Sequence, residues 1–359
     1  MSVRPEKIID ADFKSALNYL TSNEVSLSPS LLFAFSDVTR PELQQFAQVW
    51  LTLPAERRRR MTQAMTELAE ERIEADYSRI FRYLLDDEDA LVRGQAINGL
   101  WEDEDPALIR PLIGALRSDP DARVRAAAAE GLGRFLLLAE TKRIPAVDGD
   151  EIQTALLASI RNLGEDQLVH RRAIEAIAYL GDETVRNLIL VAYADDDAKM
   201  RATALFAMGR SADPYWKRTV AQELFSPDPQ LRFEAARAIG ELEFKAAVPR
   251  LIDLLQDDDR EVQSAAITSL GQIGGKDARL ALIAVIEGED DVARALAQDA
   301  LDELEFESGS NMLLVDIGLE SEEEELLAEE LEEDDVEFEE QEDEPRDLLD
   351  DDLRPRRKR

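Results

Sequence analysis

Apolar residues in the middle of the chain recur at the spacing of an amphipathic helix. Seven segments align on one template, and they begin at Leu91, Arg123, Leu168, Lys199, Gln230, Glu261 and Val292. With the second residue of each segment as position zero, apolar or small side chains occupy offsets 0, 4, 7 and 8, and also offset 11 except at Asp103. These offsets share one face at about 3.6 residues per turn, so each segment is predicted to be a helix that buries this face.

The seven segments form an internal repeat. Position zero falls at residues 92, 124, 169, 200, 231, 262 and 293, so the spacing is 32, then 45, then 31 four times. The long interval indicates an insertion of about fourteen residues between Phe135 and Asp150. Alanine at offset four would let neighbouring helices approach closely, and every repeat has one, at Ala96, Ala128, Ala173, Ala204, Ala235, Ala266 and Ala297.

Shorter apolar segments of helical length and period lie between the predicted helices, so each repeat is expected to be a pair of helices. Pro111 and Pro249 occupy the same place in two of these shorter segments. A proline inside a helix removes a hydrogen bond, so the sequence predicts a kinked first helix in both repeats.

An aspartate precedes each predicted repeat helix, three residues before position zero, at Asp89, Asp121, Asp166, Asp197, Asp228, Asp259 and Asp290. A carboxylate there accepts hydrogen bonds from the first turn and complements the helix dipole, with about 1 kcal/mol gained per cap. The acidic runs 195–197 and 257–259 could instead bind calcium, but they lack the alternating ligands, glycine and distal glutamate of an EF-hand loop. We interpret the seven aspartates as structural caps, and we predict no metal site.

The repeated pattern of Asp, Val-Arg, Ala and Leu-Gly resembles the HEAT-repeat superfamily, in particular its short, phycobilisome-lyase-like class. The resemblance covers residues 77–304. It implies an all-α fold, a right-handed α-α superhelical solenoid of helix pairs. Tetratricopeptide and ankyrin repeats are excluded because their characteristic patterns do not recur.

The resemblance also implies a ladder of aspartate and arginine side chains between successive repeats. Its arginines would be Arg93, Arg125, Arg201, Arg232 and Arg294, with His170 and Gln263 in the two remaining positions. The single histidine is therefore interpreted as a hydrogen-bond donor of the ladder. A catalytic base is the alternative, but no second catalytic residue stands at a fixed spacing from it.

The ends of the array differ from its middle. Residues 41–76 are predicted to be a degenerate repeat, in which Arg58 replaces the capping aspartate, and residues 1–40 an N-terminal helical cap. The arginine run 57–60 is interpreted as a solvated helix face, although it could bind an anion or nucleic acid.

Residues 305–359 are predicted to form a disordered acidic tail that ends in a basic cluster. Between residues 320 and 352, 21 of 33 side chains are acidic and one is basic, while the last seven residues add five positive charges. Apolar clusters interrupt the acidic run, at Met312–Val315, Leu326–Leu327, Val336 with Phe338, and Leu348–Leu349. The tail could bind a basic, partly apolar protein or the solenoid's own concave face, or it could be a solubiliser. The basic end could be a nuclear localisation signal or a lipid-binding patch, or it could pair with the acidic tail.

The composition of the whole chain excludes several kinds of catalytic, metal and redox site. It carries 78 acidic and 42 basic side chains, a net charge of −36, one histidine and no cysteine. The chain therefore has no disulfide, thiolate nucleophile, zinc-thiolate site or iron–sulfur cluster, and we predict no cofactor. Nucleic acid is an unfavourable partner for so acidic a chain. The start resembles no signal peptide and no apolar run is long enough to span a membrane, so a cytoplasmic location is expected.

A partner surface is predicted where aromatic residues and arginines gather on three successive repeat helices. Their outward positions hold Arg171, Tyr179, Phe206, Arg210, Phe233 and Arg237. These residue types are enriched in binding hot spots, so we expect a protein or peptide of acidic and apolar character to bind there. The alternative is that Phe206 and Phe233 are buried between helices.

The sequence thus predicts a non-catalytic protein-interaction scaffold that binds its partner on the concave face, with the acidic-hydrophobic tail as a second interaction element. The alternative implied by the resemblance is a bilin lyase-like subunit that handles a tetrapyrrole. A deoxyhypusine hydroxylase-like activity would need paired His-Glu motifs, which one histidine cannot supply. A DNA-binding HEAT protein would need a basic groove, whereas residues 1–319 carry a charge of −21.

Overall fold

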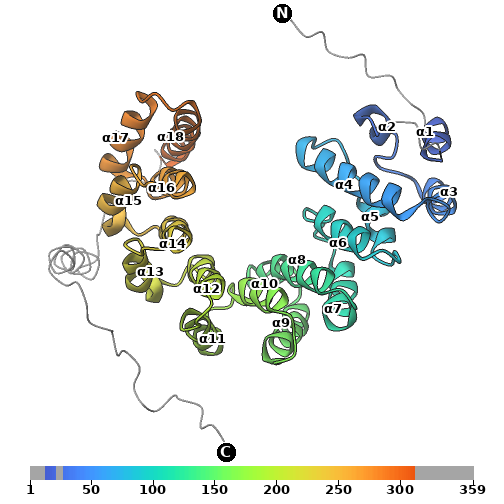
Figure 1. The fold of residues 1–359 in the computed structure, drawn as a ribbon, viewed down its shortest axis with the longest axis horizontal. Helices are drawn as coiled ribbons and strands as arrows, with labels where there is room; N and C mark the ends of the chain where they lie inside the picture. The colour runs from blue at the N-terminus through green and yellow to red at the C-terminus, as the bar shows by residue number, and fades with distance from the viewer. Residues whose placement is uncertain (1–12, 22–26, 312–359) are drawn as a thin grey trace, which may run out of the picture. The chain divides into compact units, whose positions relative to one another are not determined.

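The computed structural model describes residues 13–21 and 27–311, and the regular structure in these ranges is entirely helical (Figure 1). The chain divides into two compact units, unit 1 up to Pro214 and unit 2 from Tyr215. The sequence did not predict this division. The acidic segment and basic cluster of the predicted tail lie outside the described residues.

Unit 1 contains twelve α-helices in its described part: α1 (Phe13–Leu20), α2 (Pro29–Phe33), α3 (Arg40–Trp50), α4 (Ala55–Glu71), α5 (Ser78–Leu84), α6 (Ala90–Gly99), α7 (Ile109–Ser118), α8 (Ala122–Glu140), α9 (Ala146–Arg161), α10 (Gln167–Ile177), α11 (Glu183–Tyr193) and α12 (Ala198–Arg210). The short 3-10 helix η1 (Pro106–Leu108) precedes α7. The helices α6, α8, α10 and α12 carry four of the aligned segments, and each packs on the next in chain order. We call helices of this kind repeat helices, and those between them partner helices.

Unit 2 continues the same alternation. It contains α13 (Lys217–Glu223), α14 (Pro229–Glu241), α15 (Val248–Leu254), α16 (Arg260–Ile273), α17 (Gly275–Ile286) and α18 (Asp291–Asn311), and η3 (Lys245–Ala247) precedes α15. The repeat helices α14, α16 and α18 pack on one another, while α15 packs on α17 in the second layer (Figure 1). Helix α18 runs seven residues past the predicted end of the repeats at residue 304.

The core of each unit lies between its two layers of helices. All seven alanines at offset four have no exposed surface, so this face of every repeat helix is packed in the core. Position zero is buried in the first six repeats, from Val92 to Val262. The buried face predicted from offsets 0 and 4 therefore forms this core.

The insertion lengthens a helix pair and forms no long loop. Helix α8 has 19 residues and α9 has 16, and the two are joined by residues 141–145. A Cβ atom at Gly149 on α9 would lie 2.7 Å from Cβ of Ala139 on α8, so the added turns pack closely on each other. The extra residues thus enlarge the core of unit 1.

The predicted proline kinks are wrong. Pro111 is the third residue of α7 and Pro249 is the second residue of α15, because a short 3-10 helix precedes each of these α-helices. The first N–H groups of a helix have no partner within it, so a proline there removes no hydrogen bond. Both prolines mark the start of a helix.

The interpretation of residues 57–60 as a solvated face is wrong for Arg58. This residue lies inside α4 and is 4% exposed, while Arg59 and Arg60 are exposed. Its Nη1 atom donates to Asp87 at 3.3 Å, and the indole Nε1 of the buried Trp50 donates to the same carboxylate at 2.6 Å. Arg58 thus connects the degenerate repeat to the first regular one.

Candidate interaction surfaces

The capping aspartates bind the first turns of their own helices. Each of the seven accepts a backbone N–H from the residue two positions later, with N···O distances of 2.8–3.0 Å. At Asp121, a further hydrogen bond from the Arg123 side chain holds the pKa at about 2. The carboxylates are thereby committed to helix starts, which is the role predicted for them.

The ladder uses other carboxylates than the caps. Arg93 donates to both oxygens of Asp119 at 2.7 and 2.8 Å, and Arg232 donates to both oxygens of Asp257 at 2.8 Å. Both acceptors stand two residues before a capping aspartate. Arg125 donates through two nitrogens to a single oxygen of Glu165, at 3.1 and 2.6 Å, and Glu165 stands one residue before its cap. These ion pairs join consecutive repeats within each unit.

Other ladder positions contact backbone oxygens. Arg201, Gln263 and Arg294 donate to carbonyl groups five or six residues earlier in the chain. Nε2 of His170 lies 2.9 Å from the carbonyl oxygen of Asn162, and because a carbonyl only accepts, this nitrogen is the donor. The histidine thus donates a hydrogen bond, as predicted from its register, and its acceptor is a loop carbonyl group rather than a ladder carboxylate.

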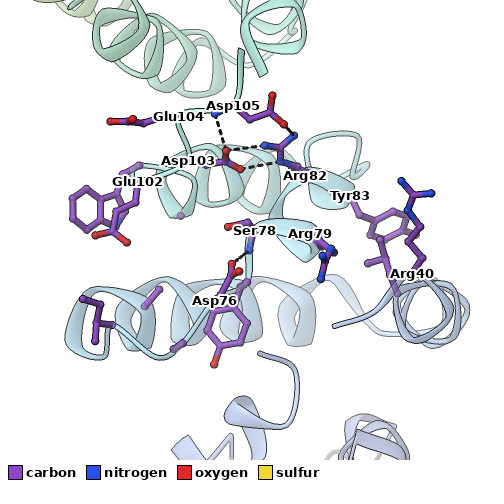
Figure 2. A pocket seen from close by; sticks show the side chains of 17 residues that line it. Arg40, Asp76, Ser78, Arg79, Arg82, Tyr83, Glu102, Asp103, Glu104 and Asp105 are labelled. Carbon is purple, nitrogen blue, oxygen red and sulfur yellow. Dashed lines mark hydrogen bonds and ion pairs between the residues drawn. The ribbon is translucent and has the colours of Figure 1, made fainter. Parts of the chain in front are cut away.

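A cleft of about 960 Å³ opens in unit 1 where residues of α3 to α6 and the segment after α6 meet (Figure 2). Arg82 extends across it and donates to Asp103 at 2.7 and 2.9 Å, and it forms an ion pair with Asp105 at 2.9 Å. The side chain of Trp101 lines the cleft and is 50% exposed. No pattern in the sequence predicts this cleft.

Four of the five acidic residues that line the cleft, Asp76, Asp103, Glu104 and Asp105, already have partners in the protein. Asp103 accepts Arg82 and the N–H of Asp105, while Glu104 pairs with Arg143 at 2.5 Å. Asp76 accepts the N–H of Ser78 at 2.8 Å (Figure 2). Across the described part of the chain, no group of three His, Asp or Glu side chains is arranged to hold a metal ion. The cleft is thus a polar surface stabilised by its own ion pairs.

Three of the four predicted partner residues of unit 1 form one cluster. Arg210, at the end of α12, lies with its guanidinium carbon 4.3 Å from the ring centre of Phe206 and 5.2 Å from that of Tyr179. All three side chains are half-buried. Arg171, one turn from the start of α10, instead lies 4.0 Å from Asp197. We call Tyr179, Phe206 and Arg210 the aromatic–arginine cluster.

The predicted residues of unit 2 lie on α14 and belong to a different environment. Arg237 pairs with Glu241 at 2.9 Å and with Glu234 at 3.6 Å, so local carboxylates neutralise it. Phe233 is half-buried. The aromatic–arginine cluster therefore lies within unit 1.

The predicted helix phase holds only in part. Ala202 shares its offset with Arg171 and Phe233, but it is buried because α10 packs against α12.

The carboxylates that pair with the ladder arginines were not predicted, although a repeated acidic position in the sequence indicates them. An acidic residue recurs two positions before the cap, at Asp87, Asp119, Asp195 and Asp257. Arg58 and the Trp101 cleft have no comparable repeat signal.

Comparison with known proteins agrees with this geometry. The family described as HEAT repeats matches residues 78–147 and 218–302, which lie in the paired helices of both units. These two stretches of the chain are HEAT repeats. The chain's place in the short, phycobilisome-lyase-like class stays a prediction. No curated protein matches the chain in sequence.

Several solved structures are similar to this HEAT-repeat chain. A chain from the complex of CpcE and CpcF of phycocyanin lyase from Nostoc sp. PCC7120 is 18% identical, with 71% of this chain and 94% of that chain covered and a TM-score of 0.46. Human deoxyhypusine hydroxylase is 20% identical over 74% of this chain and 96% of its own, with a TM-score of 0.32. A chain from the complex of Kap95p with RanGDP is 14% identical over 89% and 46%, with a TM-score of 0.40.

None of the described helices is both long enough and apolar enough to cross a membrane.

Proposed function

We propose that the protein is a non-catalytic interaction scaffold, and that the aromatic–arginine cluster of unit 1 binds an acidic, partly apolar segment of a partner protein. The proposal rests on one observation, the set of groups that Arg210 contacts. Within the described ranges it has no carboxylate partner, and its contacts are the rings of Phe206 and Tyr179. Arg171 and Arg237 differ from it, because each has a carboxylate within 4.0 Å.

The chemistry of the cluster supports a ligand with both carboxylates and apolar side chains. A guanidinium stacked on aromatic faces keeps its N–H groups at the edge, where they can donate to a carboxylate. The half-buried rings of Phe206 and Tyr179 offer apolar surface beside those donors. Arginine and aromatic residues together form the energetic centre of many protein interfaces. The acidic-hydrophobic segment 320–352 of this chain has the same chemistry and is proposed as a second interaction element.

A defined peptide tests the proposal. A labelled peptide with the sequence of residues 320–340 would be titrated against the chain shortened to residue 319, and fluorescence anisotropy would give the dissociation constant. Losing a charge-assisted hydrogen bond of roughly 1.5–3 kcal/mol predicts that Arg210→Ala weakens binding by about tenfold or more. Arg117→Ala, an exposed arginine on partner helix α7, is the matched control and should bind like the unchanged chain.

The outcome that would contradict the proposal is equal binding by the Arg210 and Arg117 variants, or no binding by the unchanged chain. Helical circular dichroism should be the same for all three proteins. Affinity capture with the full chain and the Arg210→Ala variant then identifies natural partners, since a specific partner is recovered by the first and lost from the second.

A further inference from the structure

The cleft of unit 1 contains a tryptophan that departs from the repeat pattern. Trp101 stands nine positions after Val92, where five of the other six repeats have a buried glycine or alanine, at Gly133, Ala178, Gly209, Gly240 and Gly271. A Cβ atom at Gly133 would lie 3.0 Å from Cα of Ala176 on the next repeat helix, and one at Gly271 would lie 2.8 Å from Cβ of Ala300. A small residue at this position thus lets one repeat helix pack closely on the next.

Helix α6 ends at Gly99, so the chain has left the helix before Trp101, and a large side chain does not separate the repeat helices there. Trp101 is 50% exposed and lines the cleft. Ile73, which follows α4, lines the same cleft and is 91% exposed. Exposed apolar side chains within an otherwise polar cleft are typical of a contact surface.

Hydrogen bonds hold the backbone that carries Trp101. Arg134 of α8 donates to the carbonyl oxygen of Trp101, and it donates to that of Asp103 at 2.9 Å. Arg82 donates to the side chain of Asp103 at 2.7 Å, so the segment after α6 is attached to both α5 and α8. A fixed backbone reduces the entropy lost on binding, and a tryptophan side chain has few rotamers to lose. Trp101 is therefore preorganised as an anchor.

The charges of the cleft are divided between its ends. Figure 2 shows Glu102 and Glu104 at one end and Arg40 and Arg79 at the other. Glu102 follows Trp101 directly and is exposed, and within the described ranges it forms no ion pair. A tryptophan ring attracts a cation to its face, and a carboxylate forms charge-assisted hydrogen bonds with one. This end of the cleft thus suits a positively charged side chain.

We propose that the Trp101 end of the cleft binds a lysine or arginine side chain from a basic segment of a partner protein. The aliphatic part of that side chain packs on the indole, and its charged group binds Glu102. The cleft volume of about 960 Å³ is far larger than one side chain and accommodates the flanking residues of the segment. The ligand is opposite in charge to the one proposed for the aromatic–arginine cluster, so this inference does not rest on that function.

The indole N–H signals in a nuclear magnetic resonance spectrum test the site directly. The chain has three tryptophans, and Trp50 and Trp216 are buried, so Trp101 alone among them is exposed. The isotope-labelled full chain would be titrated at about 0.15 M salt with an acetylated and amidated peptide that has the basic sequence of residues 353–359. Binding predicts a saturable shift of one indole signal, the one that is missing from Trp101→Phe.

Two pairs of variants separate this site from general charge attraction, with anisotropy of the labelled peptide as the measurement. Trp101→Ala should weaken binding about fivefold or more, whereas Leu163→Ala, in the exposed loop after α9, should not change it. Glu102→Gln should weaken binding about threefold, whereas Glu183→Gln removes the same charge from an exposed site on α11 and should not. Arg210→Ala should also leave binding unchanged, which distinguishes this site from the aromatic–arginine cluster.

Three results would overturn the proposal. The first is a Trp101 indole signal that stays in place as the peptide is added, and the second is an equal loss of affinity in Trp101→Ala and Leu163→Ala. The third concerns the full chain without peptide. If Arg356→Gln, Arg357→Gln and Lys358→Gln together moved the Trp101 signal, the site would belong to the end of the chain itself and not to a partner. Helical circular dichroism should be the same for all variants.

Discussion

Asp257 shows how one side chain joins two repeats. Its carboxylate accepts both N–H groups of Arg232 from the preceding repeat at 2.8 Å, and it accepts the N–H of the capping residue Asp259 at 2.9 Å. The aspartate side chain is 7% exposed, so water cannot replace these bonds easily. The neighbouring Asp258 is exposed and serves as a natural control.

We predict that Asp257→Asn lowers the free energy of unfolding by about 2 kcal/mol, because it replaces a charged acceptor of several hydrogen bonds by a neutral amide. Asp258→Asn should change it by less than about 0.5 kcal/mol. Urea denaturation followed by circular dichroism measures both. Equal losses in the two variants would contradict the role assigned to Asp257.

The same pair has a defined pH dependence. The hydrogen bond from Arg232 lowers the pKa of Asp257 below its ordinary value. A group with a lowered folded pKa contributes stability above its unfolded pKa of about 3.9, and the contribution is lost as the pH falls through the folded pKa. The stability difference between the unchanged chain and Asp257→Asn should therefore be constant above about pH 5 and shrink below about pH 4.

At the scale of the helices, substitution by alanine is expected to change the melting temperature in opposite directions at two glycines. A Cβ atom at Gly133 on α8 would lie 3.0 Å from Cα of Ala176 on α10, whereas at Gly114 on α7 it would meet nothing within 4 Å. Both residues lie inside helices, where alanine is favoured over glycine by about 0.5–1 kcal/mol. We predict that Gly114→Ala raises the melting temperature and that Gly133→Ala lowers it, because the helices must move apart.

Thermal denaturation measures this pair of variants. If Gly133→Ala were as stable as Gly114→Ala, the contact of α8 with α10 would be looser than the structure shows.

The start of a helix could be predicted from the sequence where a side chain caps it, as at the seven capping aspartates. They were not predictable around Pro111 and Pro249, because the short 3-10 helices before them have no pattern of their own.

At the scale of the whole chain, the net charge determines which classes of partner can bind. The net charge is −36, and residues 320–359 contribute −15 of it, so the remainder carries −21. Binding to duplex DNA requires clustered positive charge that displaces counterions. We predict no measurable binding of a 20-base-pair duplex at about 0.15 M salt, either by the full chain or by the chain shortened to residue 319.

Fluorescence anisotropy with labelled DNA tests this prediction. Binding by the shortened chain, with an affinity that falls steeply as salt rises, would contradict it and would show that a local basic surface outweighs the net charge. A matched titration with the acidic peptide described above confirms that the same protein sample is competent to bind.

The repeated sequence determined the helix pairs, the buried alanines at offset four and the start of every repeat helix, since all of these depend on periodicity and on local hydrogen bonds. Tertiary structure alone decided which side chains meet across helices. It buried Arg58 against Asp87, paired the ladder arginines with Asp119 and Asp257 rather than with the caps, and stacked Arg210 on Phe206 and Tyr179. It did so because distances between helices depend on how the whole stack packs, and no local pattern in the chain encodes them.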